Sequence, residues 1–330
     1  MSQSLAQPAT KLLDQWGPSM CAAISPTSTM SPMSHSEAAA WCAQLTHARS
    51  ENFSVLSSLL PEKSHADFAA IYAFCRWADD LGDEAQSPEQ ALELLAWWRD
   101  ELRQCYHGAA KHPIFIALKP VIARHELPEN LFDQLIQAFE WDNRQNRWES
   151  LEELTRYCAL SANPVGRLVL AVLGEPRDES LAQLSDCTCT ALQLVNHWQD
   201  VKRDLLQRDR VYLPRDAWRD IPDFESRLLI TARRGWAADL DFLPAYRDML
   251  STLCDHTEKL FDQGHALLRS LSPTSRPVVG LFSDGGRGVL KHIRQWDFET
   301  CIRRPNMSRM EKLILVSKAW LAAHRNRGAL

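Results

Sequence analysis

The sequence predicts an all-α protein, and three observations lead to that prediction. From Ser36 onward, apolar residues recur at a helical period, and the alternation typical of strands is nowhere sustained. Turn signals such as Leu60-Pro61, Asn163-Pro164 and Leu213-Pro214 punctuate the pattern. No repeat of fixed period indicates a solenoid, so one helical domain is the simplest organisation.

The expected elements can be taken in chain order. Residues 1–35 are rich in Ser, Thr, Pro, Met and Ala and lack an apolar period, which predicts a flexible tail. Residues 36–330 are expected to form the single all-α domain. Within it, five segments are amphipathic at a helical period: Ala91 to Tyr106, Asn130 to Asn143, Arg177 to Leu206, Ala245 to Leu271 and Met310 to His324.

Glycines interrupt the pattern late in the chain, in the stretch "SDGGRGVLKHIRQWDF". A GGxG sequence can cradle a phosphate group, but alone it is weak evidence. We expect Gly285, Gly286 and Gly288 to form a turn that starts a helix.

Composition excludes several classes of function. The 330 residues carry a formal net charge of −5, which argues against a nucleic-acid partner held by a strongly basic surface. The nine cysteines are scattered without metal or redox spacing, so we expect buried thiols in a reducing, cytoplasmic setting. The sequence has no run of about eighteen apolar residues that would predict a transmembrane segment. It also has no charged region followed by an apolar stretch that would predict a signal peptide.

The first cluster of charged residues lies in "CRWADDLGDE", from Cys75 to Glu84. The residues before it are apolar on nearly every helical face, as in a helix that is buried all round. Carboxylates at the end of such a helix need partners, because an unpaired charge is costly to remove from water. Helical spacing places Arg76, Asp79 and Asp83 on one stripe with Asp80 beside it. A solvated helix end is the alternative interpretation.

A second cluster, in "LQLVNHWQDVKRD", favours partnered carboxylates over a solvated helix end. Its polar residues share one helical stripe: Gln193, Asn196, Asp200 and Asp204. Two such helices facing each other would form a cage of oxygen ligands, which is what Mg²⁺ accepts together with substrate phosphates. A surface helix whose aspartates pair with Lys202 and Arg203 is the alternative.

Basic residues follow the second cluster, close to "RVYLP". They suit a diphosphate held by metal on one side and by guanidinium groups on the other: Arg203, Arg208, Arg210 and Arg215. An acidic metal site in an apolar bundle predicts a substrate with a diphosphate head and a long hydrocarbon tail. The expected chemistry is ionisation, with an apolar, aromatic cavity sheltering the carbocation.

Six stretches together resemble the squalene and phytoene synthase family of head-to-head prenyl synthases: "ENFSVLSSLLP", "YAFCRWADDLGDE", "YCALSANPVG", "LQLVNHWQDVKRD", "RVYLP" and "GRGVLKHIRQWDFETCIRRP". The resemblance runs from about His47 to Pro305, with the motifs in the family's order and spacing. It implies the all-α isoprenoid synthase bundle with a central apolar cavity, a prenyl diphosphate substrate, and a reaction that depends on Mg²⁺.

The resemblance also assigns roles to residues. It implies metal ligands in the two aspartate motifs: Asp79, Asp80, Asp83, Asp200 and Asp204. Arg76 matches a diphosphate-binding arginine, and Asn196 and Gln193 lie one and two turns before the second motif. Arg203 and Arg210 are expected to bind the diphosphate because of the charge pattern described above.

Two aromatic residues have assigned places as well. Tyr157 matches a tyrosine near the reacting carbons, and a core tyrosine is the alternative. Phe53 matches an aromatic residue that lines the substrate site, with plain core packing as the alternative. The family often has a second aromatic residue four positions later, where this chain has Ser57.

Gln199 departs from the family pattern, because family members usually have Arg immediately before the second motif. The sequence "WQD" most resembles the bacterial hydroxysqualene synthase branch. That branch ionises presqualene diphosphate, lets the cation rearrange and quenches it with water, whereas eukaryotic squalene synthases quench it with hydride from NADPH. Our hypothesis is that Asn196, Gln199 or Tyr157 positions the water.

Two alternatives stay open at this stage. One is condensation of two prenyl diphosphates to presqualene diphosphate, dehydrosqualene or phytoene, and the sequence leaves a C30 or C40 product open. The other is a catalytically silent assembly factor, which need not bind pyrophosphate in the presence of metal. The expected partners are a presqualene diphosphate synthase and a hydroxysqualene reductase, with peripheral contact at a membrane.

Overall fold

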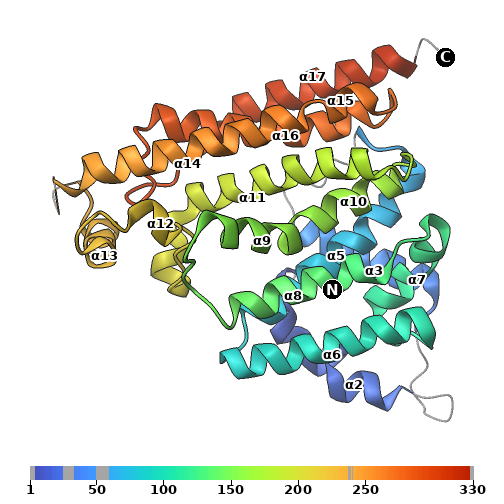
Figure 1. The fold of residues 1–330 in the computed structure, drawn as a ribbon. Coiled ribbons are helices and arrows are strands. Elements are labelled where there is room, and N and C mark those ends of the chain that lie inside the picture. The colour runs from blue at the N-terminus through green and yellow to red at the C-terminus, as the bar shows by residue number, and fades with distance from the viewer. Residues whose placement is uncertain (1–3, 25–32, 50–58, 237–238, 240, 328–330) are drawn as a thin grey trace. The chain divides into compact units, whose positions relative to one another are not determined.

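Helices make up the regular structure throughout the part of the chain that the computed structural model describes (Figure 1). The described residues are 4–24, 33–49, 59–236, 239 and 241–327. Within these described residues, β-type backbone pairing is limited to one isolated bridge, between Arg147 and Val211. The all-α prediction is confirmed, and the central apolar cavity stays a prediction.

The described chain falls into two compact units. Unit 1 consists of Met1–Arg144 and Arg167–Pro176, and unit 2 consists of Gln145–Gly166 and Arg177–Leu330. The sequence predicts one domain over 36–330. The division into two units, each assembled from separate stretches of chain, is a finer organisation that helical periodicity does not reveal.

The helices of unit 1 follow in chain order: η1 (Ser4–Ala6), η2 (Ala9–Leu12), α1 (Leu13–Trp16), α2 (Pro18–Ala23), α3 (His35–Arg49), η3 (Glu62–Ser64), α5 (His65–Asp83), α6 (Pro88–His107), α7 (Pro113–His125) and α8 (Glu129–Asp142). Helix α10 (Asn163–Val172) crosses the boundary between the units. The helices of unit 2 are α9 (Leu151–Ser161), α11 (Glu179–Arg208), α12 (Arg215–Trp218), α13 (Phe224–Arg234), α14 (Phe242–Gly264), α15 (Leu267–Ser270), α16 (Arg276–Gln295) and α17 (Arg309–Arg327). No helix in the described ranges combines the length and the apolar character that crossing a membrane requires.

Four of the five amphipathic segments correspond to single helices, α6, α8, α11 and α17. The fifth, Ala245 to Leu271, is wrong as one helix, because the structure divides it into α14 and α15. The division falls at Gly264, where an added Cβ would lie 2.1 Å from the hydroxyl oxygen of Thr188 on α11. Close packing at this glycine is not visible in a hydrophobic pattern.

Helix α5 is the central helix of unit 1 and contacts α3, α6, α7 and α8. Its Phe74 and Trp77 side chains are fully buried and lie against Trp98 of α6, with ring centroids 5.7 and 6.1 Å apart. Large aromatic side chains bury much apolar surface, and their contacts fix how neighbouring helices pack. This core holds the end of α5 that carries the first aspartate cluster.

Residues 4–24 correct the prediction of a flexible tail over 1–35. The segment forms η1, η2, α1 and α2, and η1 contacts α3 while η2 contacts α5. Ala9 and Leu12 are buried, and the backbone N–H of Ala9 donates to a carboxylate oxygen of Asp80 at 2.9 Å. The composition argument fails here because a few small apolar residues suffice when they pack on a finished helical core.

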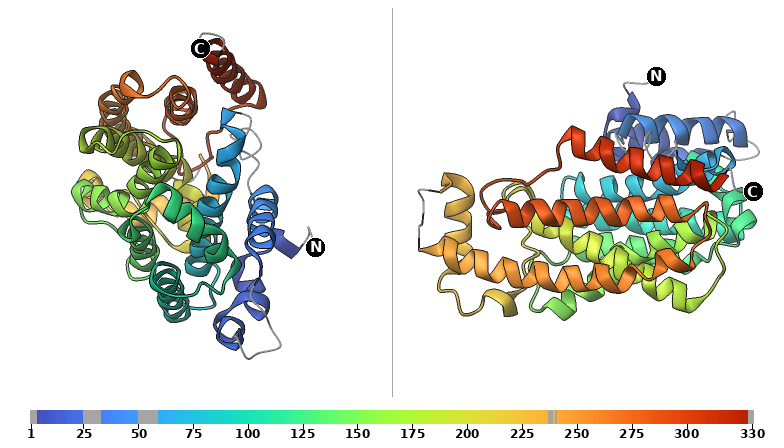
Figure 2. Two further views of the ribbon diagram at one scale, coloured as in Figure 1. Left: turned by 90° about the vertical axis from the view of Figure 1, so that its right-hand side faces the viewer. Right: turned by 90° about the horizontal axis from the view of Figure 1, so that it is seen from above.

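Helix α11 is the longest described helix of unit 2 and packs against α14 and α16 (Figure 2). Its rotation is fixed in part by Trp198, whose indole N–H donates to the hydroxyl of Thr257 on α14 at 2.8 Å. On α16, a Cβ at Gly286 would lie 2.5 Å from Leu192 of α11 and 2.6 Å from Phe261 of α14. These three helices therefore approach closely at Gly286.

The glycine-rich stretch is thus not a turn that starts a helix, and that prediction is wrong. Gly285, Gly286 and Gly288 all lie inside α16. Gly288 also faces a neighbour, because an added Cβ would lie 2.7 Å from the sulfur of Met307. Close packing, rather than turn formation, accounts for Gly286 and Gly288.

His112 is a buried histidine at the start of α7. Its Nδ1 accepts a hydrogen bond from the backbone N–H of Ile114 at 3.2 Å, and its ring lies among tryptophans of α5 and α6. Burial lowers the pKa of His112 to about 3. The folded protein therefore keeps the ring neutral, whereas the unfolded chain takes up a proton below about pH 6.5. Stability associated with His112 is present above pH 6.5 and is lost as the pH falls toward 3.

Replacing His112 by Asn should make unfolding less dependent on pH. Asn keeps a side-chain acceptor for the helix N-terminus but cannot take up the proton. Between pH 6 and 4.5, the slope of unfolding free energy against pH should decrease by up to about 1.4 kcal/mol per pH unit. Urea unfolding across that range measures the slope. The exposed His107 gives a matched control as His107→Asn, and equal slopes for wild type and His112→Asn would contradict the assignment.

Candidate functional site

The first aspartate cluster lies at the C-terminal end of α5. The helix forms because apolar side chains cover almost all of its surface, and it ends where the N–H of Glu84 bonds to the carbonyl of Asp80. A helix C-terminus carries partial negative charge, so carboxylates there are unfavourable unless cations accompany them. Arg76 supplies one cation, at 3.0 Å from Asp79 and 2.7 Å from Asp80.

Asp80 is the most enclosed of the three aspartates, and its carboxylate is only 2% exposed. It pairs with Arg76 and, at 2.9 Å, with Arg49 of α3, and it accepts the N–H of Ala9. Both of its oxygens are therefore engaged within unit 1. A carboxylate surrounded in this way holds neighbouring elements together.

Asp79 and Asp83 are more open than Asp80. The Asp79 side chain is 34% exposed and Asp83 is partly exposed, and the two are one helical turn apart. Burial works against the charge of Arg76, but the carboxylates of Asp79 and Asp80 raise the pKa of its guanidinium above the usual value. Arg76 thus stays a cation next to an open pair of carboxylates.

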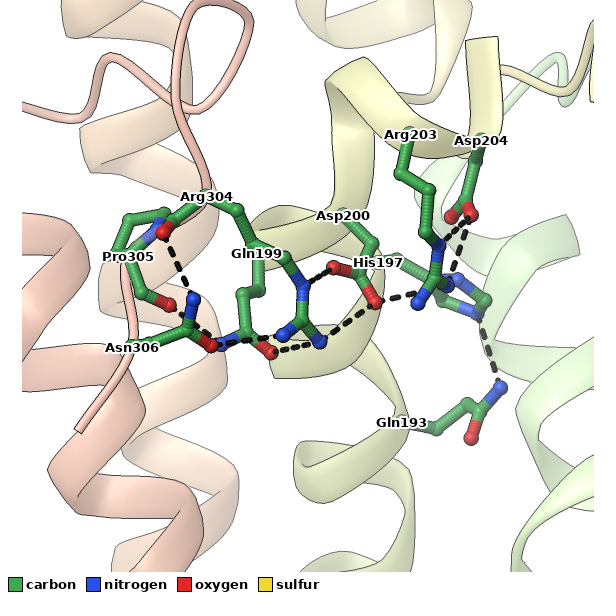
Figure 3. Close-up of polar contacts among 9 residues, drawn as sticks. All are labelled: Gln193, His197, Gln199, Asp200, Arg203, Asp204, Arg304, Pro305 and Asn306. Atoms are coloured by element: carbon green, nitrogen blue, oxygen red, sulfur yellow. Dashed lines mark hydrogen bonds and ion pairs between the residues drawn. The ribbon is translucent and has the colours of Figure 1, made fainter. Parts of the chain in front are cut away.

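The second aspartate cluster lies in unit 2, near the C-terminal end of α11 (Figure 3). Asp178 caps the start of this helix through Ser180, and Asp209 in a left-handed conformation ends it. Asp200 and Asp204 are both buried. Arg203 lies between them, at 2.8 Å from the first carboxylate and 2.9 Å from the second.

The arginine bridge has an electrostatic reason. Two carboxylates one turn apart repel each other, and a guanidinium between them removes the repulsion. Burial raises the pKa of Asp204, while Arg203 opposes that rise. The alternative of a surface helix whose aspartates pair with Lys202 and Arg203 is right about the pairing with Arg203. It is wrong about exposure, because Asp200 and Asp204 are both buried, and Lys202 donates to the carbonyl of Ile302 instead.

Asp200 has a second cationic partner that helical spacing does not reveal. Arg304, in the connection between α16 and α17, forms an ion pair with Asp200 and donates to the amide oxygen of Gln199 at 3.3 Å (Figure 3). Arg304 belongs to the "RRP" that closes the last family motif, but the sequence alone does not indicate what it contacts. Its partners lie more than a hundred residues earlier in the chain.

The remaining polar residues of the α11 stripe have unlike surroundings. Asn196 is exposed, and Gln193 is half-buried with its amide nitrogen 3.4 Å from Nε2 of His197. Gln199 is buried and donates to the carbonyl of Pro305 at 2.5 Å. The water-holding hypothesis for Gln199 therefore competes with the contacts that its amide already makes.

Tyr157 of α9 belongs to a group of rings in unit 2. Its ring lies 4.8 Å from Trp148 and 5.9 Å from both His197 and Tyr212, measured between centroids. His197 and Tyr212 stack at 3.8 Å. Burial, together with the positive charges of Arg203 and Arg210, lowers the pKa of His197 to about 3. This buried aromatic group therefore remains uncharged at neutral pH, close in the sequence to Asp200.

Two further predicted residues complete the list of candidates. Arg210 is buried, and its backbone N–H donates to the carbonyl of Asp204 at 3.1 Å. Phe53 lies outside the described residues, as does Ser57. The structure thus brings together Arg76 with the first cluster and Arg203 with the second, while each cluster belongs to its own unit.

The donor set suits a hard divalent cation. Within the described ranges, no three carboxylate, imidazole or thiol groups gather around one point as a complete protein site. Each cluster instead offers two carboxylates spaced by one helical turn, the kind of partial set that Mg²⁺ completes with water and substrate phosphate oxygens. The residues therefore fit the ion that the sequence predicts.

The fold and the paired aspartates define an all-α protein of the isoprenoid synthase type. The squalene/phytoene synthase family model matches residues 46–311. The chain belongs to the squalene/phytoene synthase family, and the resemblance stated from its motifs is confirmed. Members of this family are enzymes of the prenyltransferase type that act on diphosphates.

Two individual relatives are similar to this chain over different lengths. A hydroxysqualene synthase of Sinorhizobium fredii is 36% identical over 170 residues, which cover 51% of this chain and 56% of that protein. This match therefore spans about half the length of the relative. A phytoene synthase of Thermus thermophilus is 29% identical over 289 residues, covering 85% of this chain and 91% of that protein.

A solved structure supports the same fold. The crystal structure of squalene synthase HpnC from Alicyclobacillus acidocaldarius is 37% identical to this chain and superposes with a TM-score of 0.70. The match covers 80% of this chain and 95% of that chain. The family fold thus applies to most of the described residues.

Proposed function

We propose that this protein is a hydroxysqualene synthase, which converts presqualene diphosphate and water to hydroxysqualene and diphosphate. The observation that carries the proposal is the enclosed pair Asp200 and Asp204, bridged by Arg203 and preceded by an uncharged Gln199. The 36% identity to a hydroxysqualene synthase supports this choice of substrate within the family.

The proposed metal ligands are the two aspartate pairs, Asp79 with Asp83 and Asp200 with Asp204. Bound Mg²⁺ would neutralise the diphosphate oxygens and make the diphosphate a better leaving group. Asp80 has a different part in this proposal, because its oxygens are already engaged by Arg49, Arg76 and Ala9. It holds Arg76 in place at the end of α5.

The chain's own residues would act on the diphosphate first. Arg76 and Arg203 each lie against carboxylates and stay charged, so they can donate charge-assisted hydrogen bonds to phosphate oxygens. The carbon–oxygen bond breaks, and its electron pair leaves with the diphosphate. Cations placed before the reaction stabilise this developing negative charge without further rearrangement.

The quench requires one water molecule. The rearranged C30 carbocation takes the oxygen of water, and the proton lost from that water passes to solvent, so the reaction is balanced without an oxidant or a reductant. Asn196 and Tyr157 are the residues we propose to position the water. Gln199 is omitted from this role, because both ends of its amide are engaged by the loop that carries Arg304.

The first test uses the purified protein with presqualene diphosphate and Mg²⁺, without NADPH, and mass analysis of the extracted product. Hydroxysqualene is expected, with turnover lost on adding EDTA and restored by excess Mg²⁺, because the aspartate pairs need a cation to bind diphosphate. A silent assembly factor of this fold would give no product. Binding of pyrophosphate that does not depend on metal would also contradict the proposal.

Condensation of two prenyl diphosphates is the second candidate, and one observation favours it. The phytoene synthase match covers more of this chain than the hydroxysqualene synthase match does. The same assay separates the two candidates when farnesyl or geranylgeranyl diphosphate is supplied instead. Consumption of those substrates, without turnover of presqualene diphosphate, would assign the protein to the condensing enzymes.

A further inference from the structure

The connection between α16 and α17 is fastened to α11 at Gln199 and Asp200. Arg304, Pro305 and Asn306 form the part in contact, here called the 304–306 loop (Figure 3). These contacts lie entirely within unit 2. They join residues that are more than a hundred positions apart in the sequence.

Gln199 uses both ends of its amide in this contact. Its nitrogen donates to the carbonyl of Pro305 at 2.5 Å and to the side-chain oxygen of Asn306 at 3.2 Å. Its oxygen accepts from Arg304 at 3.3 Å. The residue is 5% exposed. An amide is a side-chain group that can donate twice and accept at the same place, which a guanidinium or an apolar group cannot do.

Arg304 is held by three partners at once. It pairs with Asp200, donates to Gln199, and donates to the side-chain oxygen of Asn306 at 2.7 Å. Asn306 in turn donates to the backbone carbonyl of Arg304 at 3.1 Å. Gln199, Arg304 and Asn306 thus form a closed ring of hydrogen bonds that orients the guanidinium toward Asp200.

Asp200 therefore faces two guanidinium groups, and they differ in freedom to move. Arg203 lies on the same helix, three residues away, and is tied to Asp204 as well. Arg304 is carried by a connection outside any helix, and its side chain is 45% exposed. If another cation approaches Asp200, Arg304 can be displaced with less structural change.

We propose that Gln199 is a positioning residue that fixes Arg304 on Asp200 and so holds the 304–306 loop over the second aspartate pair. Arg304 then competes with a divalent cation for Asp200, and its release leaves a guanidinium available to an anion beside the metal. This last consequence rests on the proposed function, whereas the positioning of Arg304 by Gln199 does not.

The positioning role is tested without metal or substrate, by hydrogen exchange of the peptide that covers residues 303–308. Gln199→Met keeps the length of the side chain and removes both polar ends. We expect exchange about tenfold faster in this variant. The variant should still fold, because Lys202 independently donates to the carbonyl of Ile302 at 2.9 Å. Gln207→Met, at an exposed amide on the same helix, is the matched control and should exchange as wild type does.

Asn306→Ala provides a second variant that removes a different member of the ring. Asn306 is exposed, so the substitution leaves the core untouched, and faster exchange of the same peptide is expected. Unchanged exchange in both Gln199→Met and Asn306→Ala would overturn the proposal. Thermal unfolding of each variant separates a loosened loop from general loss of structure.

Competition at Asp200 is tested by Mn²⁺ binding, measured by electron paramagnetic resonance without substrate. Arg304→Gln and Gln199→Met should each bind Mn²⁺ about tenfold more tightly, the size of other outer-shell effects on metal affinity. The double variant should bind no more tightly than Arg304→Gln, because Gln199 acts through Arg304. Independent, additive effects would overturn this mechanism. Absence of Mn²⁺ binding in every variant would refute the metal site, while hydrogen exchange still decides the positioning role.

Discussion

Replacing Asp79 by Asn is expected to lower kcat/KM for presqualene diphosphate at least about 100-fold, while the free energy of unfolding changes by no more than about 0.5 kcal/mol. In our account Asp79 is a metal ligand, and an amide oxygen is a weaker ligand for Mg²⁺ than a carboxylate. Its ion pair with Arg76 is one-third exposed on both sides, so that pair contributes little to stability. Steady-state kinetics and urea unfolding measure the two quantities.

Asp100 supplies a matched control for Asp79. It lies in the same unit, and it pairs with Arg103 at 2.9 Å with the same three-residue separation as Arg76 and Asp79. Asp100→Asn should leave both kcat/KM and the unfolding free energy close to wild type. If Asp79→Asn retained more than about a tenth of wild-type activity, Asp79 would not be a metal ligand.

Replacing the next residue, Asp80, by Asn is expected to act mainly on stability, with a loss of about 3 kcal/mol in the free energy of unfolding. The carboxylate is almost completely buried between Arg49 and Arg76, so its removal takes the counter-charge from Arg49 and leaves Arg76 with its pair to Asp79 alone. The N–H of Ala9 also loses a charged acceptor, which should loosen the N-terminal segment. Urea unfolding gives the free energy, and hydrogen exchange of residues 4–24 reports on the segment.

Asp100→Asn again serves as the control for charge removal in unit 1. The prediction for Asp80 fails if the variant unfolds within about 0.5 kcal/mol of wild type, or if residues 4–24 exchange at the wild-type rate. In that case the contacts of Asp80 would be incidental, and its assignment as a metal ligand by resemblance would regain support. The two neighbouring aspartates thus separate catalysis from stability within one helix.

The long amphipathic helices α6, α8, α11 and α17 could be predicted from the sequence, because helical periodicity is a local property. The stripes of Asp79 with Asp83 and of Asp200 with Asp204 follow from spacing alone, and the structure places each pair on one helix. The errors occurred where tertiary packing decides the outcome. Gly286 is tolerated inside α16 because three helices meet there, and no local signal distinguishes that position from a turn.

The partners of the aspartates could not be predicted by spacing. Arg49 reaches Asp80 from another helix, and Arg304 reaches Asp200 from a connection more than a hundred residues later. The same holds for the N-terminal segment, whose order depends on contacts with α3 and α5 rather than on its own propensity. Long-range pairing of charges depends on the folded arrangement. A single sequence therefore identifies the charged residues but not which of them form pairs.

The origin of the oxygen in the product is the most direct test of the proposed reaction. Presqualene diphosphate is incubated with the protein and Mg²⁺ in ¹⁸O-labelled water, and the extracted alcohol is analysed by mass spectrometry. Our account predicts labelled hydroxysqualene, because the carbon–oxygen bond breaks and water supplies the new hydroxyl group. An unlabelled alcohol would show cleavage at phosphorus with the original oxygen retained, and that result would contradict ionisation at carbon.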